Sequence, residues 1–172
     1  MARVPPAAVT MLFAVLTLFT PALQSMPDDP DTLREVTVGT WFSVLAPPGS
    51  HVEMTKGVDS GTGRIVTPRF TLTFDYGLYG DPLDADTADT NYHATEAQID
   101  GHSARIMSAF APHRSADHPY FSGVHFPDLG RTGRGPLTLT VTSNLKTGDD
   151  LALAEKIYRS IRIKVSVTKA TP

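Results

Sequence analysis

The chain has 172 residues, a net charge of −3 and no cysteine. This length suits one self-sufficient domain and is short for two. The lack of cysteine excludes thiol catalysis, cysteine zinc sites, iron–sulfur clusters and lipid attachment through an N-terminal cysteine. Lysine and arginine are scattered over a mildly acidic chain, which disfavours nucleic acid or anionic lipid as the main partner.

Residues 1–25 have the composition of a secretory signal peptide. Arg3 is their only charge, and residues 9–19 are apolar apart from two threonines. This apolar run is shorter than the roughly 20 residues that span a bilayer, so a retained anchor is the weaker alternative. We expect cleavage after Ala22 or Ser25, with Ser25 favoured, which would leave a periplasmic or secreted protein with no stable membrane span.

The mature chain is predicted to hold one domain at residues 41–167. A polar lead-in at 26–40 is expected to be exposed, and the tail at 168–172 is expected to fray. No repeat or linker divides the chain. The first half of the domain contains strand patterns, separated by turns rich in Pro or Gly, at 41–46, 51–56 and 65–79. The last of these alternates apolar residues with Thr and Asp, which predicts a half-buried strand.

Strand patterns continue through the second half of the domain. Asp100-Gly101 suits a type I′ hairpin turn, because both central residues of that turn need positive φ. A loop at 111–119 and a Gly/Arg turn at 128–135 separate the later segments. The predicted strands of this half lie at 92–99, 103–110, 120–126, 137–142 and 161–167.

One helix is predicted, at residues 149–160. Acidic residues at its start and basic residues near its end suit the two ends of the helix dipole. Apolar residues recur at steps of three and four, and so share one face: Leu151, Ala154, Ile157, Tyr158 and Ile161. The fold class is therefore predicted as α+β. We expect an antiparallel sheet of about six or seven strands, packed against this C-terminal helix in an arrangement like an αβα sandwich.

Asp59 lies in the segment GVDSGTGRI (57–65), which resembles the Asp-Ser/Thr-Gly signature of aspartic proteases. That fold requires an apolar strand before the motif and an apolar pair before a later glycine. Residues 53–57 are polar, and only Leu129 precedes Gly130 at the place where the pair would lie. We therefore interpret the segment as a turn and assign Asp59 no catalytic role.

Other catalytic and ligand-binding patterns are also incomplete. The glycines of the same segment suggest a phosphate-binding loop, but a strand-like stretch follows where a helix N-terminus is needed. Ser, His and Asp are all present, yet no Gly-x-Ser-x-Gly elbow occurs. Aromatic side chains could line a pocket, although aromatic residues at strand period usually belong to a core: Phe74, Tyr76 and Tyr79, with Arg69.

Three histidines, His113, His118 and His125, lie close together in the sequence, with Asp117 and Asp128 nearby. Two imidazoles and a carboxylate could form a surface zinc or copper site. Their spacing matches no tight metal motif, and a solvated loop accounts for them better. We assign no catalytic, cofactor-binding or metal-binding residue.

Three segments resemble the PsbP/Mog1/DcrB-like superfamily. Residues 42–50 (FSVLAPPGS) are similar to its F-S-V-x-x-P-x-G opening, and 99–105 (IDGHSAR) are similar to its central hairpin. The order of strand 137–141, helix 149–160 and the segment SIRI (160–163) resembles its ending. The resemblance spans residues 41–165.

The resemblance implies a compact αβα sandwich with no conserved catalytic apparatus, and no catalytic residue is carried over from it. Members are mostly accessory or binding modules. This chain lacks the cysteine that anchors the bacterial envelope lipoproteins. We therefore expect an exported, non-enzymatic module of the bacterial cell envelope that binds a protein or a small ligand. The alternative is a periplasmic hydrolase with a site assembled from dispersed residues.

Overall fold

The computed structural model describes residues 32–57, 60–86 and 88–164. The predicted signal peptide, Asp59 and the predicted tail at 168–172 lie outside these residues. Among the described residues, no helix combines the length and the apolar character needed to cross a membrane.

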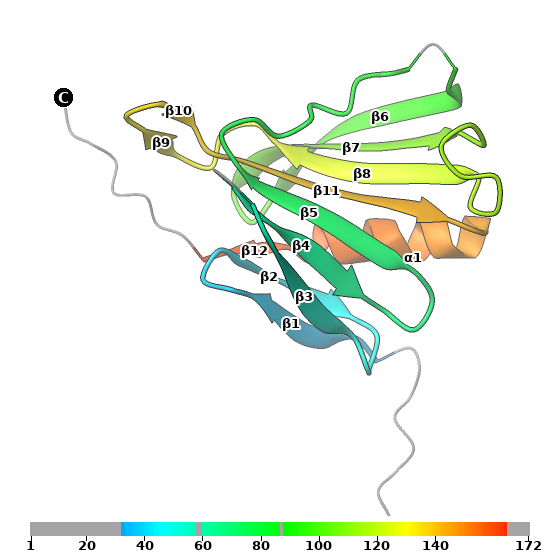
Figure 1. The fold of residues 1–172 in the computed structure, drawn as a ribbon, viewed down its shortest axis with the longest axis horizontal. Coiled ribbons are helices and arrows are strands. Elements are labelled where there is room, and N and C mark those ends of the chain that lie inside the picture. The colour runs from blue at the N-terminus through cyan, green and yellow to red at the C-terminus, as the bar shows by residue number, and fades with distance from the viewer. Residues whose placement is uncertain (1–31, 58–59, 87, 165–172) are drawn as a thin grey trace, which may run out of the picture.

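A seven-stranded antiparallel sheet forms the centre of the domain (Figure 1). β11 lies between β5 and β8 and so joins the two halves of the sheet, although it comes last of the seven in the chain. In sheet order the strands are β3 (His51–Lys56), β4 (Gly61–Val66), β5 (Thr71–Gly77), β11 (Thr138–Leu145), β8 (Tyr120–Phe126), β7 (His102–Phe110) and β6 (Thr90–Ile99).

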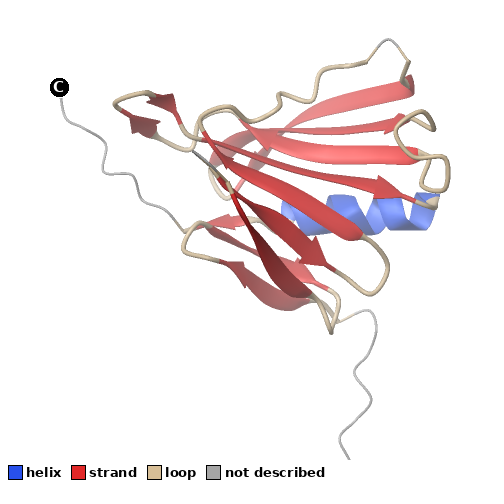
Figure 2. Ribbon diagram, viewed as in Figure 1, coloured by secondary structure: helices blue, strands red, loops and turns tan. Residues whose placement is uncertain are grey.

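One face of this sheet, which we call the inner face, is covered by two elements. Helix α1 (Gly148–Arg159) packs against β8, β11 and β7 (Figure 2). A second sheet, of three strands in the order β1 (Arg34–Val38), β2 (Phe42–Ala46) and β12 (Arg162–Ile163), covers the β3–β5 side. Phe42 of β2 meets Phe74 of β5 edge to face, with ring centroids 5.6 Å apart. The domain is therefore α+β and dominated by strands.

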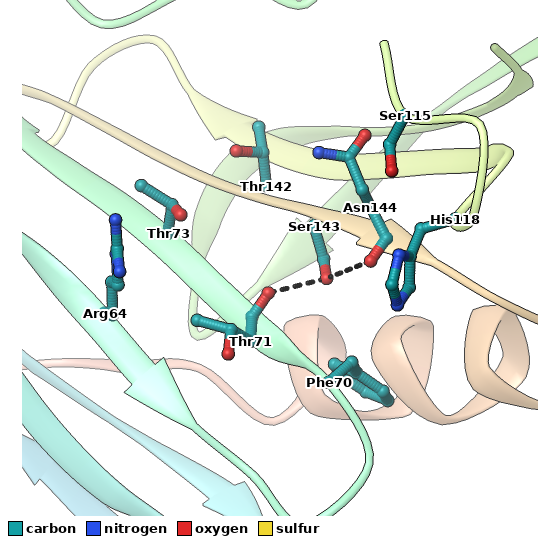
Figure 3. Close-up of a pocket in the computed structure, with 9 residues that line it drawn as sticks. All are labelled: Arg64, Phe70, Thr71, Thr73, Ser115, His118, Thr142, Ser143 and Asn144. Carbon is teal, nitrogen blue, oxygen red and sulfur yellow. Dashed lines mark hydrogen bonds between the residues drawn. The ribbon is translucent and has the colours of Figure 1, made fainter. Parts of the chain in front are cut away.

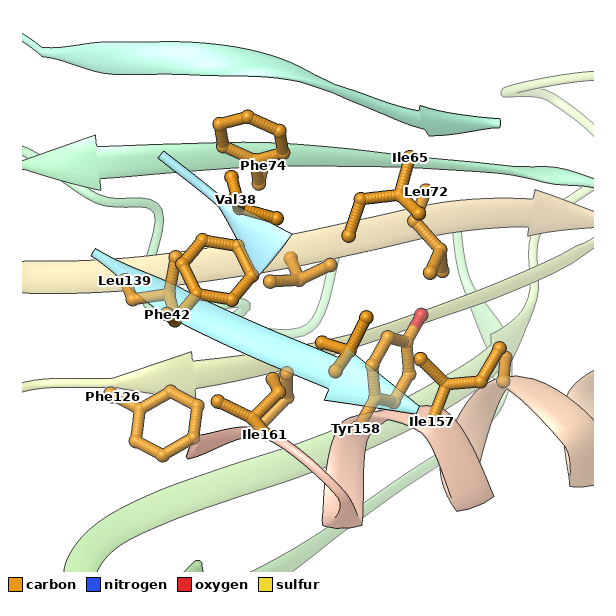
Figure 4. Close-up of a cluster of buried hydrophobic side chains, with 14 of the residues drawn as sticks. Val38, Phe42, Ile65, Leu72, Phe74, Phe126, Leu139, Ile157, Tyr158 and Ile161 are labelled. Atoms are coloured by element: carbon orange, nitrogen blue, oxygen red, sulfur yellow. The ribbon is translucent and has the colours of Figure 1, made fainter. Parts of the chain in front are cut away.

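The core lies between the inner face and its two covers (Figure 4). Ile157 and Tyr158 of α1 are fully buried there, as is Ile161 just after the helix. The Tyr158 hydroxyl donates a hydrogen bond to the Ser122 carbonyl at 3.2 Å, which ties the helix to β8. The apolar helix face that the sequence predicts is thereby confirmed, with Leu151 half-buried at its edge.

The start of α1 is fixed by a capping box. The Asp150 backbone N–H donates to the Thr147 hydroxyl, and the Thr147 backbone N–H donates to the Asp150 carboxylate, each at 3.1 Å. The Thr147 hydroxyl also donates to this carboxylate, at 2.7 Å. Such reciprocal bonds satisfy N–H groups that the first helical turn leaves unpaired. The cap also fixes where the helix begins, and therefore which face meets the sheet.

The opposite, outer face of the large sheet is only partly covered. The loop between β5 and β6 carries Leu83 onto β7 and β8, where it forms a small second cluster with Met107 and Phe121. Tyr92 donates to the Leu83 carbonyl at 2.9 Å, which fastens this loop. The described part of the chain has one helix, so a loop stands where an αβα sandwich would place a second helical layer.

One local prediction is confirmed and two are corrected. Asp100 and Gly101 have φ of 52° and 80°, as the hairpin turn requires. The lead-in predicted at 26–40 contains β1 instead, because Val36 and Val38 alternate with polar residues, face the core together and pair with β2; Val38 is fully buried. The strand predicted at 161–167 is limited to β12 among the described residues.

Two turns predicted from glycine also contain strands. Gly61–Val66 forms β4, so residues 61–65 of the segment 57–65 belong to a strand and not to a turn. The Gly/Arg turn at 128–135 holds a small hairpin made of β9 (Arg131–Thr132) and β10 (Gly135–Pro136). Two backbone bonds close the base of this hairpin: the Leu129 N–H donates to the Leu137 carbonyl at 2.8 Å, and the Leu137 N–H donates to the Gly130 carbonyl at 2.7 Å.

Candidate functional site

A polar groove crosses the uncovered part of the outer face. It encloses about 420 Å³, within the roughly 300–1,000 Å³ that is usual for small-molecule sites. Figure 3 shows the side chains that line it, which come from β4, β5, β11, the β4–β5 turn and the loop 111–119: Arg64, Phe70, Thr71, Thr73, Ser115, His118, Thr142, Ser143 and Asn144.

The floor of the groove follows from the two-residue period of β5 and β11. Side chains alternate between the faces of a strand. Leu72 and Val141 are therefore buried in the core, whereas Thr73 and Thr142 reach the outer face, where their Cα atoms are register partners. The threonines that mark these segments as strands in the sequence thus also build a hydroxyl-rich floor.

One wall is Arg64 of β4, which pairs with Thr73 in the ladder and is exposed. The opposite wall is the loop 111–119, which contributes Ser115 and His118. The groove therefore combines hydroxyl groups with a cation and an imidazole. No acidic residue lines this cavity within the described part of the chain.

The loop 111–119 is held in place by Arg114. Its Nε and Nη2 lie 3.3 and 3.2 Å from the two carboxylate oxygens of Asp89, whose side chain is fully covered. The guanidinium also lies 4.3 Å from the centre of the Phe121 ring. A bidentate pair combined with a ring contact orients a loop more firmly than a single bond does. Ser115 and His118 are thus carried on a fixed support.

Most polar side chains of the groove have no partner in the described part of the chain. Ser143 is the exception, because its hydroxyl donates to the Thr71 carbonyl at 2.7 Å and approaches the Asn144 carbonyl at 3.4 Å (Figure 3). The side chains without a hydrogen-bond or ion-pair partner are those of Arg64, Thr71, Thr73, Ser115, His118, Thr142 and Asn144. Their donors and acceptors are therefore free to face a ligand.

A second cavity of about 400 Å³ continues the groove toward the other end of β5 and β11. The two cavities share Thr73 and Thr142. Asp75 and Asp81 line this continuation, together with Tyr79, whose side chain is 84% exposed. Arg114 also lines this continuation, but its guanidinium pairs with Asp89. Within the described residues, the groove thus has an unpaired cation at the Arg64 end and two carboxylates at the Tyr79 end.

The three histidines of the candidate metal site do not converge. His113 lies 3.6 Å from Asp89 and His118 lines the groove. His125 is buried on β8, with its Nδ1 2.9 Å from the Thr140 hydroxyl, and burial lowers its pKa. No cluster of three or more His, Asp or Glu in the described ranges could hold a metal ion.

The catalytic candidates are not assembled into a site among the described residues either. Ser143 is buried, and its proton is used in the bond to the Thr71 carbonyl, so it has no base in the position of a hydrolase triad. The predicted aromatic cluster is divided between the two faces. Phe74 and Tyr76 belong to the core, Tyr79 lies on the outer face, and Arg69 pairs with Asp150.

Several groove residues carried no signal of their own in the sequence. Arg64, Ser115 and Asn144 meet only because β11 lies beside β5 and the loop 111–119 bends over it. The alternating threonines of β5 and β11 were the one available signal. No family model matches the chain, and no curated protein matches it closely enough to count as a relative.

Proposed function

We propose that the chain is an exported, non-enzymatic binding module of the bacterial cell envelope, and that its polar groove binds a ligand rich in hydroxyl groups that also carries an acidic group. The observation that carries this proposal is the set of groove side chains without protein partners, led by Thr73, Thr142 and Arg64. An acidic saccharide has this chemistry.

The physical basis is complementarity of hydrogen bonds and charge. Threonine hydroxyls and the Asn144 amide can each donate and accept, as sugar hydroxyls do. Arg64 offers a fork of N–H donors that matches a carboxylate. The fixed loop 111–119 and the rigid strands reduce the entropy that binding would cost. Ser143 has no base beside it, which favours binding over hydrolysis.

The export part of the proposal rests on residues 1–25 and on the resemblance to the PsbP/Mog1/DcrB-like superfamily, whose members are mostly accessory or binding modules. Intact mass of protein recovered from the periplasm tests it. We expect a chain that has lost residues 1–22 or 1–25. Leu16→Arg should block export, because a charge interrupts the apolar run. A periplasmic protein that retains Arg3 would contradict cleavage.

The binding part can be tested by NMR on the ¹⁵N-labelled mature chain. Trigalacturonate supplies hydroxyls and charge, maltotriose supplies hydroxyls alone, and glutarate supplies charge alone. We expect saturable shifts at Thr73, Thr142 and Asn144, with trigalacturonate binding most tightly. The absence of saturable shifts in the groove with both saccharides would overturn the proposed ligand class.

Matched variants test whether the saccharides bind in the polar groove. Thr142→Val keeps the shape of the side chain and removes its hydroxyl. It should therefore weaken the binding of both saccharides by about three- to tenfold, the usual range for one hydrogen bond. Arg64→Gln should remove the preference for trigalacturonate over maltotriose. Thr37→Val, on the exposed side of β1, is the control and should change neither affinity.

A further inference from the structure

A second cleft lies at the end of the domain where the inner face is not fully covered. It encloses about 880 Å³, and its lining is mainly apolar. It is separate from the polar groove, with which it shares no residue. Its lining comes from the segment before β2, the end of β3, the start of β4 and the described residues beside them, the end of β5, the β9–β10 hairpin and the residue after it.

The back wall of this cleft is an aromatic stack. Trp41 and Tyr76 lie nearly parallel, at 15°, with ring centroids 5.5 Å apart. Gly61 of β4 makes room for the indole, because a Cβ at this position would collide with the Trp41 ring. The pairing of a glycine with a tryptophan thus shapes a flat apolar surface. Planar aromatic surfaces of this kind contribute large contact area at low entropic cost.

The rim of the cleft is also apolar. Met54 of β3 is 52% exposed, although most large apolar side chains of this domain are buried. Leu78 and Leu137 are half-buried on the other side. An apolar surface gathered in one concave place favours burial of an apolar group, at roughly 25 cal/mol per Å² removed from water.

One cation stands at the mouth. Arg134 lines the cleft from the tip of the β9–β10 hairpin and is exposed. Its side chain has no hydrogen-bond or ion-pair partner among the residues that the structure describes, where no acidic side chain lines the cleft. The backbone bonds that Leu137 makes with Leu129 and Gly130 fix the base of the hairpin that carries it.

From this arrangement we infer that the cleft binds a single-chain carboxylate, whose apolar tail lies on the Trp41–Tyr76 stack and whose carboxylate pairs with Arg134. An apolar wall with one unpaired arginine at its mouth fits an amphiphile of one negative charge. Arginine is suited to this role because its N–H fork matches a carboxylate. A neutral apolar molecule would make the contact with the aromatic stack but not the ion pair with Arg134, and should therefore bind more weakly.

Intrinsic fluorescence tests the inference, because Trp41 is the only tryptophan of the chain. The probes are octanoate and, as the uncharged counterpart, 1-octanol, titrated below the concentrations at which either aggregates. We expect a saturable change of Trp41 emission with both, and tighter binding of octanoate. Emission that does not saturate with octanoate would overturn the inference.

Three variants distinguish the contribution of the Arg134 charge to binding from that of the apolar lining. Arg134→Gln should weaken the binding of octanoate by about three- to tenfold, as expected for one charge-assisted pair. The affinity for 1-octanol should not change. Arg131→Gln, on the same hairpin but outside the cleft lining, is the matched control. Met54→Gln should weaken both probes. Equal effects of the two arginine variants would contradict the assignment of Arg134.

The inference is independent of the polar groove. Thr142→Val should leave octanoate binding unchanged, since Thr142 lies on the outer face. Loss of octanoate binding in that variant would show that the fluorescence reports a change of the whole fold, and would overturn the location proposed here.

Discussion

Arg69, in the turn before β5, reaches the first turn of α1, where its Nη2 lies 2.7 Å from the carboxylate of Asp150. The same carboxylate accepts bonds from the Thr147 hydroxyl and backbone N–H, at 2.7 and 3.1 Å. One buried acid thus joins the large sheet to the start of the helix. Burial raises the pKa of Asp150, but the Thr147 bonds and the charge of Arg69 outweigh it and hold this pKa below its usual range.

Replacing Asp150 with Asn should therefore destabilise the domain in a pH-dependent way. A lowered folded pKa gives stability that is complete above the unfolded pKa of about 4 and is lost as the pH falls through the folded pKa. We expect a loss of about 1–2 kcal/mol at pH 7, mostly from the cap, because solvent screens the half-exposed Arg69. Urea melts from pH 7 to 3 should show the variant converging on the wild type below about pH 4.

Asp149 provides the control for that series. It neighbours Asp150 and is exposed, and Asp149→Asn leaves the capping box in place. Its melts should follow the wild type within about 0.5 kcal/mol at every pH. A gap between the Asp150 variant and the wild type that stays constant down to pH 3 would contradict the role given to the ionised carboxylate.

Ile157→Ala tests whether the domain depends on its single described helix. Ile157 is fully buried between α1 and the sheet, and no disulfide is available to a chain without cysteine. Removal of a large side chain from a packed core costs about 2–5 kcal/mol. Denaturant melts measure the loss, with the exposed Lys156→Ala as control. Similar stability of the two variants would mean that the helix contributes little to the core.

The elements that could be predicted are those whose signals are local. The alternation in β5 and β11, the Asp100-Gly101 turn and the periodic face of α1 each act within one segment. β1 is not predicted, because its local signal is short: Val36 and Val38 alternate with polar residues, but only Val38 is fully buried, and the strand is completed by pairing with β2. Its stability comes from a neighbour that the local pattern does not specify.

The candidate sites were less predictable than the fold. The polar groove requires β11 to lie beside β5 and requires the Arg114–Asp89 pair, which joins two loops 25 residues apart. The apolar cleft requires the Trp41 ring to lie on Gly61, a close contact between the turn before β2 and strand β4 of the large sheet. Such juxtapositions depend on tertiary structure, so the residues involved look unremarkable in the sequence.

Tyr76→Phe should stabilise the protein. The Tyr76 hydroxyl is buried and is the one buried side-chain polar atom of the described residues without a hydrogen-bond partner, and burial raises its pKa, so the group stays neutral. An unpaired buried polar atom costs about 1–3 kcal/mol, part of which the variant recovers. We expect the free energy of unfolding to rise by about 1 kcal/mol in urea melts.

Tyr158→Phe is the matched opposite case. Its hydroxyl is buried as well, but it donates to the Ser122 carbonyl at 3.2 Å. Loss of that bond should lower the free energy of unfolding by about 1 kcal/mol. The two variants remove the same atom from the same residue type and should change stability in opposite directions. A decrease for both would contradict the view that the Tyr76 hydroxyl is unsatisfied.

His125 predicts a second pH effect, in a higher range than that of Asp150. Burial lowers its folded pKa, and the nearby Asp81 only partly opposes this effect, while Arg105 adds to it. In the unfolded state the imidazole has a pKa of about 6.5 and therefore binds more protons than in the folded state. The free energy of unfolding thus rises with pH through this range and falls as the pH drops below about 6.5.

His125→Asn removes the titrating group. It should flatten the decline of the free energy of unfolding between about pH 7 and 5, whatever its effect on absolute stability. The exposed His118→Asn serves as control and should keep the wild-type slope. Urea melts measure the slope of the free energy of unfolding against pH. A wild-type slope in the His125 variant would contradict the view that burial of a neutral His125 causes the pH dependence.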